Sequence, residues 1–207
     1  MNKKIIENYS YEQELYDSGL ELIGGTDEAG RGPLAGPVVA ACVIMPKGLR
    51  IEGVDDSKKL SEKKRYMLYD KIIENAISVG VGIVDEKAID EVNILNATKI
   101  AFEQAYSNLQ VKPQHMLIDA LKGLFGNTPQ TVIIKGDSLS YQIAAASIVA
   151  KVTRDRIMIE YDAKYPEYNF RQHKGYGTSD HINVLKQHGA CPIHRRSFLK
   201  NIDGIKL

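Results

Sequence analysis

The sequence is poor in cysteine and contains no long apolar run. Its two cysteines, Cys42 and Cys191, are too few and too scattered for a disulfide framework, so we expect two free thiols in a reducing cytoplasm. No stretch approaches the roughly 20 apolar residues of a membrane span. Residues 1–13 lack the apolar region of a secretory signal, and no internal repeat or low-complexity tract is found. These absences exclude a disulfide scaffold and a membrane-spanning protein.

Charge is balanced overall but unevenly distributed. The 207 residues, 43% apolar and 26% charged, are enough for one globular domain with an appendage. The net charge is +1, yet residues 1–150 hold 16 Lys/Arg against 20 Asp/Glu, whereas residues 151–207 hold 11 against 6. A basic segment joined to an acidic one fits a polyanionic substrate held beside metal ions. An unevenly charged, solvated surface is the alternative.

Hydrophobic periodicity predicts an α/β fold. The expected strands are 22–26, 38–45, 78–84, 115–118 and 131–134, and the expected helices are 61–77 with Ser61 as N-cap, 94–109, 141–160, and 179–188 ended by Gly189. The early strands are close enough to pair antiparallel, whereas the later ones are separated by helices and suggest parallel pairing. We therefore expect a mixed five-stranded sheet flanked by helices. In the helix 141–160, the small residues 144–147 are interpreted as packing.

Acidic residues follow three of the expected strands. Asp27 and Glu28 come after the first strand, Asp119 after the fourth and Asp137 after the fifth. If these strands are parallel neighbours, their carboxyl ends deliver the acids to one edge of the sheet. Four carboxylates there would repel one another without cations, and hard oxygen ligands select Mg²⁺ or Mn²⁺. Each acid alone is also explained as a turn residue or a helix cap.

A loop with three glycines, two prolines and one arginine follows the Asp27-Glu28 pair directly, at residues 30–37. Glycine lets the backbone of another molecule approach closely. The pair and the loop together suggest a metal site beside a phosphate-binding loop, and a plain turn is the alternative. A further acid, Asp155, lies four residues after Lys151, and the spacing predicts a simple helical ion pair.

Six ordered motifs of the sequence resemble those of bacterial ribonuclease HII, the type 2 ribonuclease H family. The matches run from about residue 22 to residue 198, nearly the whole chain. They are DEAGRGPLAGP at 27–37, DSKKL at 56–60, LIDA at 117–120, KGD at 135–137, AAASIVAKVTRD at 144–155 and HKGYGT at 173–178.

The resemblance implies a ribonuclease H-like fold with a C-terminal helical extension. It divides the chain into an N-terminal segment 1–20 without an assigned role, a catalytic core 21–168 and a loop-and-helix extension 169–207 that completes the substrate site. It also implies an endoribonuclease for the RNA strand of RNA–DNA hybrids. The same enzyme would cut on the 5′ side of single ribonucleotides in duplex DNA, as in ribonucleotide excision repair, leaving 5′-phosphate and 3′-hydroxyl ends. Two divalent ions, Mn²⁺ or Mg²⁺, would support an in-line displacement.

The resemblance also assigns residues. The catalytic and metal-binding acids would be Asp27, Glu28, Asp119 and Asp137. The contacts to the 2′-hydroxyl and the flanking phosphates would come from Gly30, Arg31 and Gly32, and the tyrosine that senses the RNA–DNA junction would be Tyr176. Basic side chains that are candidates for phosphate contacts, or for plain surface charge, are Lys58, Lys59, Lys174, Arg195 and Arg196.

Two other classes of function stay open. The same fold hosts metal-dependent phosphotransferases and other nucleases, and a module that binds hybrids without cutting them is a third possibility. The full set of four acids argues against the binding module, because carboxylates without metals weaken phosphate binding. The different loop and the extra N-terminal domain of the related ribonuclease HIII type are not seen. No clamp-binding motif with a glutamine and paired aromatics is found at the C-terminus, so a sliding-clamp tether is not supported. We also expect a monomer.

Overall fold

One five-stranded sheet forms the centre of the protein. The computed structural model describes residues 10–54, 57, 60–119, 121, 123–200 and 202–205. The strands are β1 (Ile23–Ala29), β2 (Val38–Ile44), β3 (Ser78–Val84), β4 (His115–Asp119) and β5 (Gln130–Ile133), in the spatial order β3-β2-β1-β4-β5. β2 pairs antiparallel with β1 and β3, whereas β1 with β4 and β4 with β5 pair parallel. The predicted mixed sheet and its pairing are confirmed.

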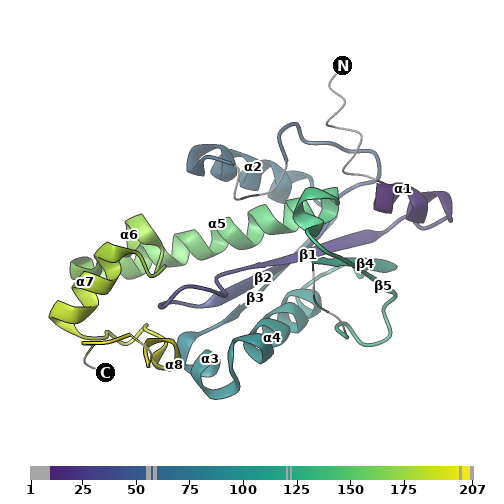
Figure 1. The fold of residues 1–207 in the computed structure, drawn as a ribbon. Coiled ribbons are helices and arrows are strands. Elements are labelled where there is room, and N and C mark those ends of the chain that lie inside the picture. Colours follow the sequence, from purple (N-terminus) through teal and green to yellow (C-terminus); the bar gives the residue numbers. More distant parts are fainter. Residues whose placement is uncertain are drawn as a thin grey trace.

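Helices cover both faces of the sheet (Figure 1). On one face α4 (Ile94–Ser107) packs on β2 and β3, with α3 (Glu86–Val92) beside it. On the other face α5 (Tyr141–Lys164) packs on β1 and β2, and α2 (Glu62–Asn75), capped by Ser61 as predicted, packs on α5. The two apolar clusters use alternate residues of β2, because successive strand side chains point to opposite faces.

The contact between α5 and β1 is unusually close. A Cβ added at Gly25 would lie 2.1 Å from the backbone carbon of Gln142, so only glycine fits there. The alanines Ala144, Ala145 and Ala146 follow on the same helix and are buried. Their interpretation as packing residues is confirmed, and this close contact fixes α5 beside the strand that carries Asp27.

Several predicted boundaries were wrong. β1 runs on to Ala29, because its pairing with β2 continues to Ala29–Val39 after its pairing with β4 has stopped at Thr26–Ile118. Asp27 and Glu28 therefore lie inside the strand rather than after it, just beyond the part that is paired on both sides. α5 extends four residues past the predicted end at 160. The short helices α1 (Ser10–Asp17), α3, α6 (Phe170–His173) and α8 (Arg196–Leu199) were not predicted.

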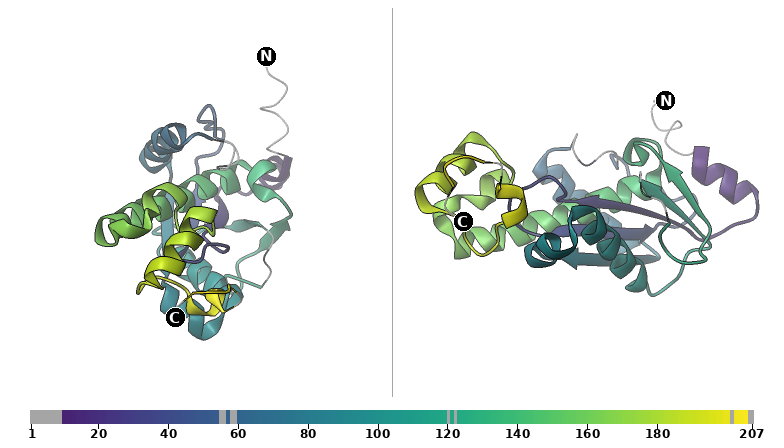
Figure 2. Two further views of the ribbon diagram at one scale, coloured as in Figure 1. Left: turned by 60° about the vertical axis from the view of Figure 1, so that its left-hand side comes forward. Right: turned by 60° about the horizontal axis from the view of Figure 1, so that its bottom comes forward.

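The C-terminal extension packs around the end of α5 that is far from α1 (Figure 2). It contains α6, α7 (Ser179–His188), which Gly189 ends as predicted, and α8. Its apolar cluster includes three buried residues from elsewhere, Ala35, Met158 and Tyr168, so the extension packs against the loop 30–37 and the end of α5.

The structure bears on the expected free thiols and on the expected lack of a membrane-spanning helix. Cys42 and Cys191 are both free thiols. Among the helices of the described ranges, none has the length and apolar character needed to cross a bilayer.

Candidate active site

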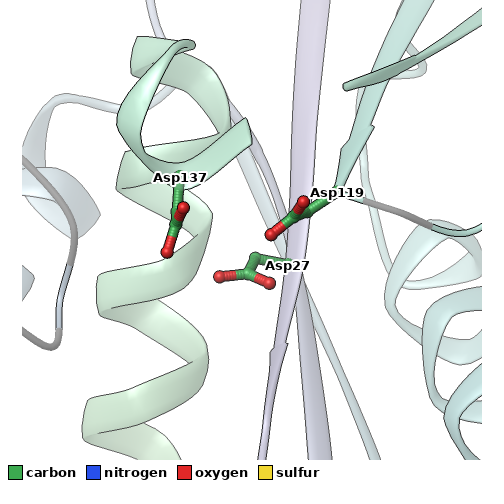
Figure 3. Close-up of side chains that lie close together, drawn as sticks. All are labelled: Asp27, Asp119 and Asp137. Carbon is green, nitrogen blue, oxygen red and sulfur yellow. The ribbon is translucent and has the colours of Figure 1, made fainter. Parts of the chain in front are cut away.

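Three of the predicted acids converge at one edge of the sheet. Asp27 comes from β1, Asp119 is the last residue of β4, and Asp137 lies in the short 3₁₀ helix η4 (Gly136–Ser138) between β5 and α5. Each offers a carboxylate oxygen, and these oxygens all lie within 4.8 Å of one another (Figure 3). Asp27 and Asp137 are buried and Asp119 is half-buried. The parallel pairing of β1 with β4 brings the first two side by side, as the sequence predicted.

The crowding of these acids is electrostatically unfavourable. Burial raises the pKa of Asp27 well above its usual range, and the neighbouring charges of Glu28 and Asp119 raise it further. Hydrogen bonds from the Ser147 hydroxyl and from the Glu28 N–H, 2.8 Å from Oδ1, oppose this shift. A bound divalent cation would remove the repulsion, and three hard oxygen donors fit Mg²⁺ or Mn²⁺.

Glu28 is not one of the three converging acids. It follows Asp27 on the same strand, where successive side chains point to opposite faces. Its Oε1 accepts a hydrogen bond from Arg31 Nη1 at 3.2 Å. The role of Glu28 as a fourth metal ligand stays a prediction.

Two buried arginines support the loop 30–37. Arg195 has an exposed fraction of 0%, and its guanidinium donates to the carbonyl oxygens of Gly30 at 2.6 Å, Arg31 at 3.0 Å and Gly36 at 2.9 Å. The predicted phosphate contact by Arg195 is therefore wrong, because all three guanidinium nitrogens serve the protein's own backbone. The bonds turn these carbonyl oxygens toward the protein interior.

Arg154 of α5 makes a matching set of bonds. It is also 0% exposed and donates to the carbonyl oxygens of Ala35 at 3.0 Å, Pro37 at 3.0 Å and Lys174 at 2.9 Å. Arg154 thereby joins the loop 30–37 to the loop 174–177. Within the described part of the chain, neither arginine forms an ion pair with a carboxylate.

The charges of both arginines persist at neutral pH. Burial lowers the pKa of Arg154 to about 10 and the pKa of Arg195 to about 9. Two cations therefore lie under the loop, and their field favours an anionic group such as a phosphate above it.

The glycines of the loop have different roles. Gly30 has φ +98°, and an added Cβ would lie 2.1 Å from Arg154 Nε, so the protein's own packing requires glycine there. At Gly32 an added Cβ would meet nothing within 4 Å. Gly32 therefore borders open space, and the fold itself does not demand a glycine at this position.

Tyr176 lies beside this loop. The N–H of Leu34 donates to the Gly175 carbonyl at 2.8 Å, and the Tyr176 side chain is 44% exposed. The Lys151 Nζ lies 5.9 Å and the Arg154 Cζ 5.8 Å from the centre of its ring. An exposed aromatic ring with cations beside it is thus held next to the loop 30–37.

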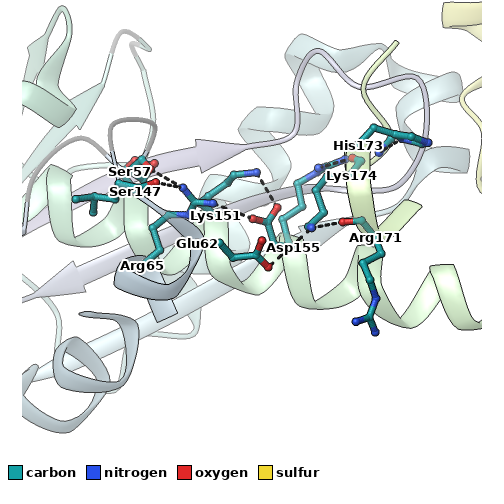
Figure 4. A network of polar contacts seen from close by, with 12 residues as sticks. Ser57, Glu62, Arg65, Ser147, Lys151, Asp155, Arg171, His173 and Lys174 are labelled. Carbon is teal, nitrogen blue, oxygen red and sulfur yellow. Dashed lines mark hydrogen bonds and ion pairs between the residues drawn. The ribbon is translucent and has the colours of Figure 1, made fainter. Parts of the chain in front are cut away.

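A network of hydrogen bonds and ion pairs runs along α5 and includes Arg65, Lys151 and Asp155 (Figure 4). Arg65 donates to the carbonyl oxygens of Ser57 at 3.0 Å and Leu60 at 2.6 Å and forms an ion pair with Asp155 at 3.7 Å. The predicted pair of Lys151 with Asp155 is confirmed, with Nζ 2.7 Å from Oδ1. Through Arg65, the backbone carbonyls of Ser57 and Leu60 are therefore linked to Asp155 of α5.

The other predicted basic residues are less directly placed. Lys58 and Lys59 lie outside the described residues. Lys174 is buried, its ammonium donates to the Arg171 carbonyl, and it forms an ion pair with Glu62 at 4.0 Å. Lys174 is thus engaged inside the protein, whereas Arg196 is exposed and remains a candidate for a phosphate contact.

Sequence reasoning missed Ser147. Its hydroxyl lies 2.8 Å from that of Ser57 and hydrogen-bonds Asp27, so it links Ser57 to the acid cluster. Ser147 ends a run of three alanines, and a run of small residues favours a packing role. Its signal in the sequence was that it is the one polar residue in that run.

Two hydrogen-bonded histidines, His181 and His194, contact the backbone of the loop that presents Tyr176. The Cys191 N–H donates to His194 Nδ1 at 3.0 Å, so the proton of His194 lies on Nε2. That nitrogen is 2.9 Å from His181 Nε2, which leaves His181 Nδ1–H to donate to the Tyr176 carbonyl at 2.9 Å. Both rings must be neutral for this arrangement, and burial lowers the pKa of each to about 4.

This histidine pair predicts acid sensitivity. Because the folded-state pKa values lie below the usual 6.5, the unfolded chain binds more protons between pH 6.5 and 4. The free energy of unfolding should fall through this window as pH falls, by up to about 1.4 kcal/mol per pH unit for each histidine. The free energy of unfolding should be measured by urea titration at several pH values between 4 and 6.5. Its dependence on pH should be shallower in His194→Gln than in the parent. The exposed His188→Gln is the control and should show the parent's dependence on pH. If the free energy of unfolding of His194→Gln depends on pH as strongly as that of the parent, the histidine pair is not the cause of the acid sensitivity.

The fold and the acid cluster define a class of protein. A mixed sheet in the order β3-β2-β1-β4-β5, with acids converging beside the ends of β1 and β4, is the ribonuclease H-like architecture. The fold class predicted from the sequence is confirmed.

The chain belongs to the ribonuclease HII family, whose sequence model matches residues 24–201. The ribonuclease HII of Ruminiclostridium cellulolyticum is 59% identical over 192 residues, which are 93% of this chain and 75% of that protein. The crystal structure of a ribonuclease H2 from Pyrococcus horikoshii has a TM-score of 0.73 and 32% identity, over 85% of this chain and 93% of that one. A ribonuclease HII of Archaeoglobus fulgidus, solved in complex with PCNA, has a TM-score of 0.68 and 28% identity, over 80% and 87%. The protein is therefore a hydrolase of the ribonuclease H type, from a metal-dependent family that cleaves the RNA of RNA–DNA hybrids.

Proposed function

We propose that the protein also incises duplex DNA on the 5′ side of a single embedded ribonucleotide. The observation that carries this proposal is the joining of two short loops beside the acid cluster. Arg154 and the Leu34–Gly175 bond hold the loop 30–37 against the loop that presents Tyr176. We expect such a site to surround one sugar, because the sequence contains no feature of an extended reader of several consecutive riboses.

Metal binding is assigned to the acids. Asp27, Asp119 and Asp137 would hold the divalent ions, Mg²⁺ or Mn²⁺, with Glu28 as the fourth acid. Ions held there would supply activation of the attacking water and stabilisation of the leaving 3′-oxygen, so the products carry 5′-phosphate and 3′-hydroxyl ends.

The remaining residues orient the substrate. Gly30, Arg31 and Gly32 would contact the 2′-hydroxyl and the flanking phosphates, with Arg31 as a charged donor. Gly32 borders open space, which supports a close approach of the substrate there. Lys58 and Arg196 are assigned to phosphate contacts that position the duplex without reading its sequence. The protein is proposed to act as a cytoplasmic monomer.

A single ribonucleotide is expected to be sufficient for cleavage. A labelled duplex with one internal ribonucleotide should be nicked on the 5′ side of that residue in Mg²⁺ or Mn²⁺. The all-DNA control lacks the 2′-hydroxyl and leaves its partners in the site unpaired, so it should stay intact. Efficient cleavage of long hybrids with no cleavage of the single-ribonucleotide duplex would show that recognition requires a run of riboses.

Tyr176 is expected to act in recognition and not in metal binding. Tyr176→Ala should lower kcat/KM on the single-ribonucleotide duplex by about tenfold or more, because loss of base or sugar stacking on an aromatic ring costs roughly 1–3 kcal/mol. Calorimetric Mn²⁺ binding should match that of the parent. Tyr176→Phe keeps the ring and serves as the control for the hydroxyl. Parent-like cleavage by Tyr176→Ala would refute the assignment.

A further inference from the structure

The N-terminal helix α1 contains a fully buried acid, Glu12. It lies before residue 24, where the match to the family model begins. Its exposed fraction is 1%, and its Oε1 accepts hydrogen bonds from Ser140 Oγ at 2.5 Å and from the Gln142 N–H at 3.1 Å. Ser140 is the N-cap of α5. A carboxylate that comes from 128 residues away is therefore built into the first turn of α5.

The bonded chain continues from Ser140 to the acid cluster. The Ser140 N–H donates to the Gly136 carbonyl at 2.8 Å, and the Gly136 N–H donates to Asp119 Oδ1 at 3.1 Å. Gly136 begins the turn η4 that carries Asp137. Three successive contacts thus join Glu12 to Asp119 and to the backbone of the turn that presents Asp137.

The turn at Asp137 requires support from outside. Lys135, directly before it, has φ +60°, a left-handed conformation that costs a non-glycine residue on the order of 1 kcal/mol or more. Strained conformations of this kind persist only where the surroundings hold them. Glu12 supplies such a hold through the two hydrogen bonds that its Oε1 accepts at the start of the 24-residue helix α5.

Apolar packing also joins α1 to the sheet and to α5. Its side chains Tyr11, Leu15 and Tyr16 pack against a buried cluster drawn from β1, β4, β5 and α5, namely Ile23, Leu117, Ile133 and Ile143. The strands β1 and β4 carry Asp27 and Asp119, and Asp137 lies between β5 and α5. Figure 1 shows α1 beside the start of α5. The helix therefore packs against β1 and β4, which carry two of the acids, and against β5 and α5, which flank the turn that carries the third.

We propose that Glu12 is a positioning residue for the metal site, which holds Asp137 and Asp119 in register by fixing the start of α5. This inference rests on the proposed role of the acid cluster in binding Mg²⁺ or Mn²⁺. It gives a function to α1, which lies in the segment 1–20 to which the sequence alone assigns no role.

The test is calorimetric titration of the full-length protein with Mn²⁺, without nucleic acid. Glu12→Ala should weaken Mn²⁺ binding by about 10- to 100-fold, the range typical of residues that orient metal ligands. Glu12→Gln keeps an oxygen acceptor for Ser140 and Gln142, so it should bind Mn²⁺ within about threefold of the parent. Glu14→Ala, an exposed acid on the same helix, is the matched control and should not change the affinity.

Cleavage assays give a second readout. The Mn²⁺ concentration for half-maximal cleavage by Glu12→Ala should rise by the same factor, and kcat at saturating Mn²⁺ should return to within a fewfold of the parent. If Glu12→Ala does not fold, Glu12→Asp keeps the charge but shortens the reach, and it should show the same weakened binding. Unchanged Mn²⁺ affinity in a folded Glu12→Ala or Glu12→Asp would reduce Glu12 to a structural role. In that case the parent still binds Mn²⁺ and cleaves, and only the role of Glu12 is refuted. If the parent itself binds no Mn²⁺, the proposed function is refuted instead.

Discussion

Asp119→Asn is expected to lower cleavage by at least ~10²-fold while raising the stability of the metal-free protein. The loss of activity follows because a charged ligand of the proposed metal site is replaced by a neutral one. The gain in stability follows because the Asp119 charge raises the pKa of buried Asp27, and its removal relieves that repulsion. The Asn side-chain oxygen can still accept the bond from the Gly136 N–H, so the turn keeps its anchor.

The opposite signs of these two effects make the test specific. Initial rates on a hybrid duplex in Mg²⁺ should be compared with thermal melting in EDTA. Asp70→Asn, which removes an exposed acid of α2, is the control and should change neither quantity appreciably. Near-normal cleavage by Asp119→Asn would remove Asp119 from the catalytic site, and a lower melting temperature would contradict the repulsion.

Gly30→Ala is expected to destabilise the protein by about 2–4 kcal/mol, since it combines a left-handed backbone with overpacking. The added Cβ would lie 2.1 Å from Arg154 Nε and 2.7 Å from the Pro37 carbonyl. Because Arg154 is the residue that joins the loop 30–37 to the loop 174–177, its displacement should also lower cleavage. Urea unfolding of the purified variant measures the first effect and kcat/KM on a single-ribonucleotide duplex the second.

Gly32→Ala is the matched variant two residues away. Nothing in the protein lies within 4 Å of the added Cβ, so stability should change by no more than ~0.5 kcal/mol. Cleavage should nevertheless fall, because the methyl group would occupy the space assigned to the substrate. Equal stability of Gly30→Ala and the parent would contradict the packing, and full activity of Gly32→Ala would contradict the substrate position.

Much of the site could be predicted because it follows from local patterns. Asp119 ends a short apolar strand, and the parallel pairing of β4 with β1 then brings it to Asp27. Ser61 and Gly189 act at the ends of their helices through bonds within a few residues. In each case the interaction that decides the structure lies within a few residues or follows from the order of the strands. Both kinds of interaction can be recognised from residue types and their spacing in the sequence.

The residues that were missed act through partners far away in the sequence. Arg195 bonds carbonyl oxygens more than 150 positions earlier, and Glu12 bonds the start of a helix 128 positions later. A charged residue in a polar segment is normally expected at the surface, so composition gave no reason to bury either one. Only the assembled fold shows that Arg195 bonds three carbonyl oxygens in the interior and that one oxygen of Glu12 accepts two hydrogen bonds there.

The most direct measurement is cleavage of an RNA–DNA hybrid by the EDTA-treated full-length protein, with Mg²⁺ or Mn²⁺ either returned or withheld. The RNA strand carries a label at each end, and the chemistry of the product ends is determined enzymatically. We predict cleavage of the RNA strand only when the metal is returned, with 5′-phosphate and 3′-hydroxyl ends. Equal cleavage in EDTA, or products ending in a 2′,3′-cyclic phosphate, would contradict the assignment of Asp27, Asp119 and Asp137 as a catalytic metal site.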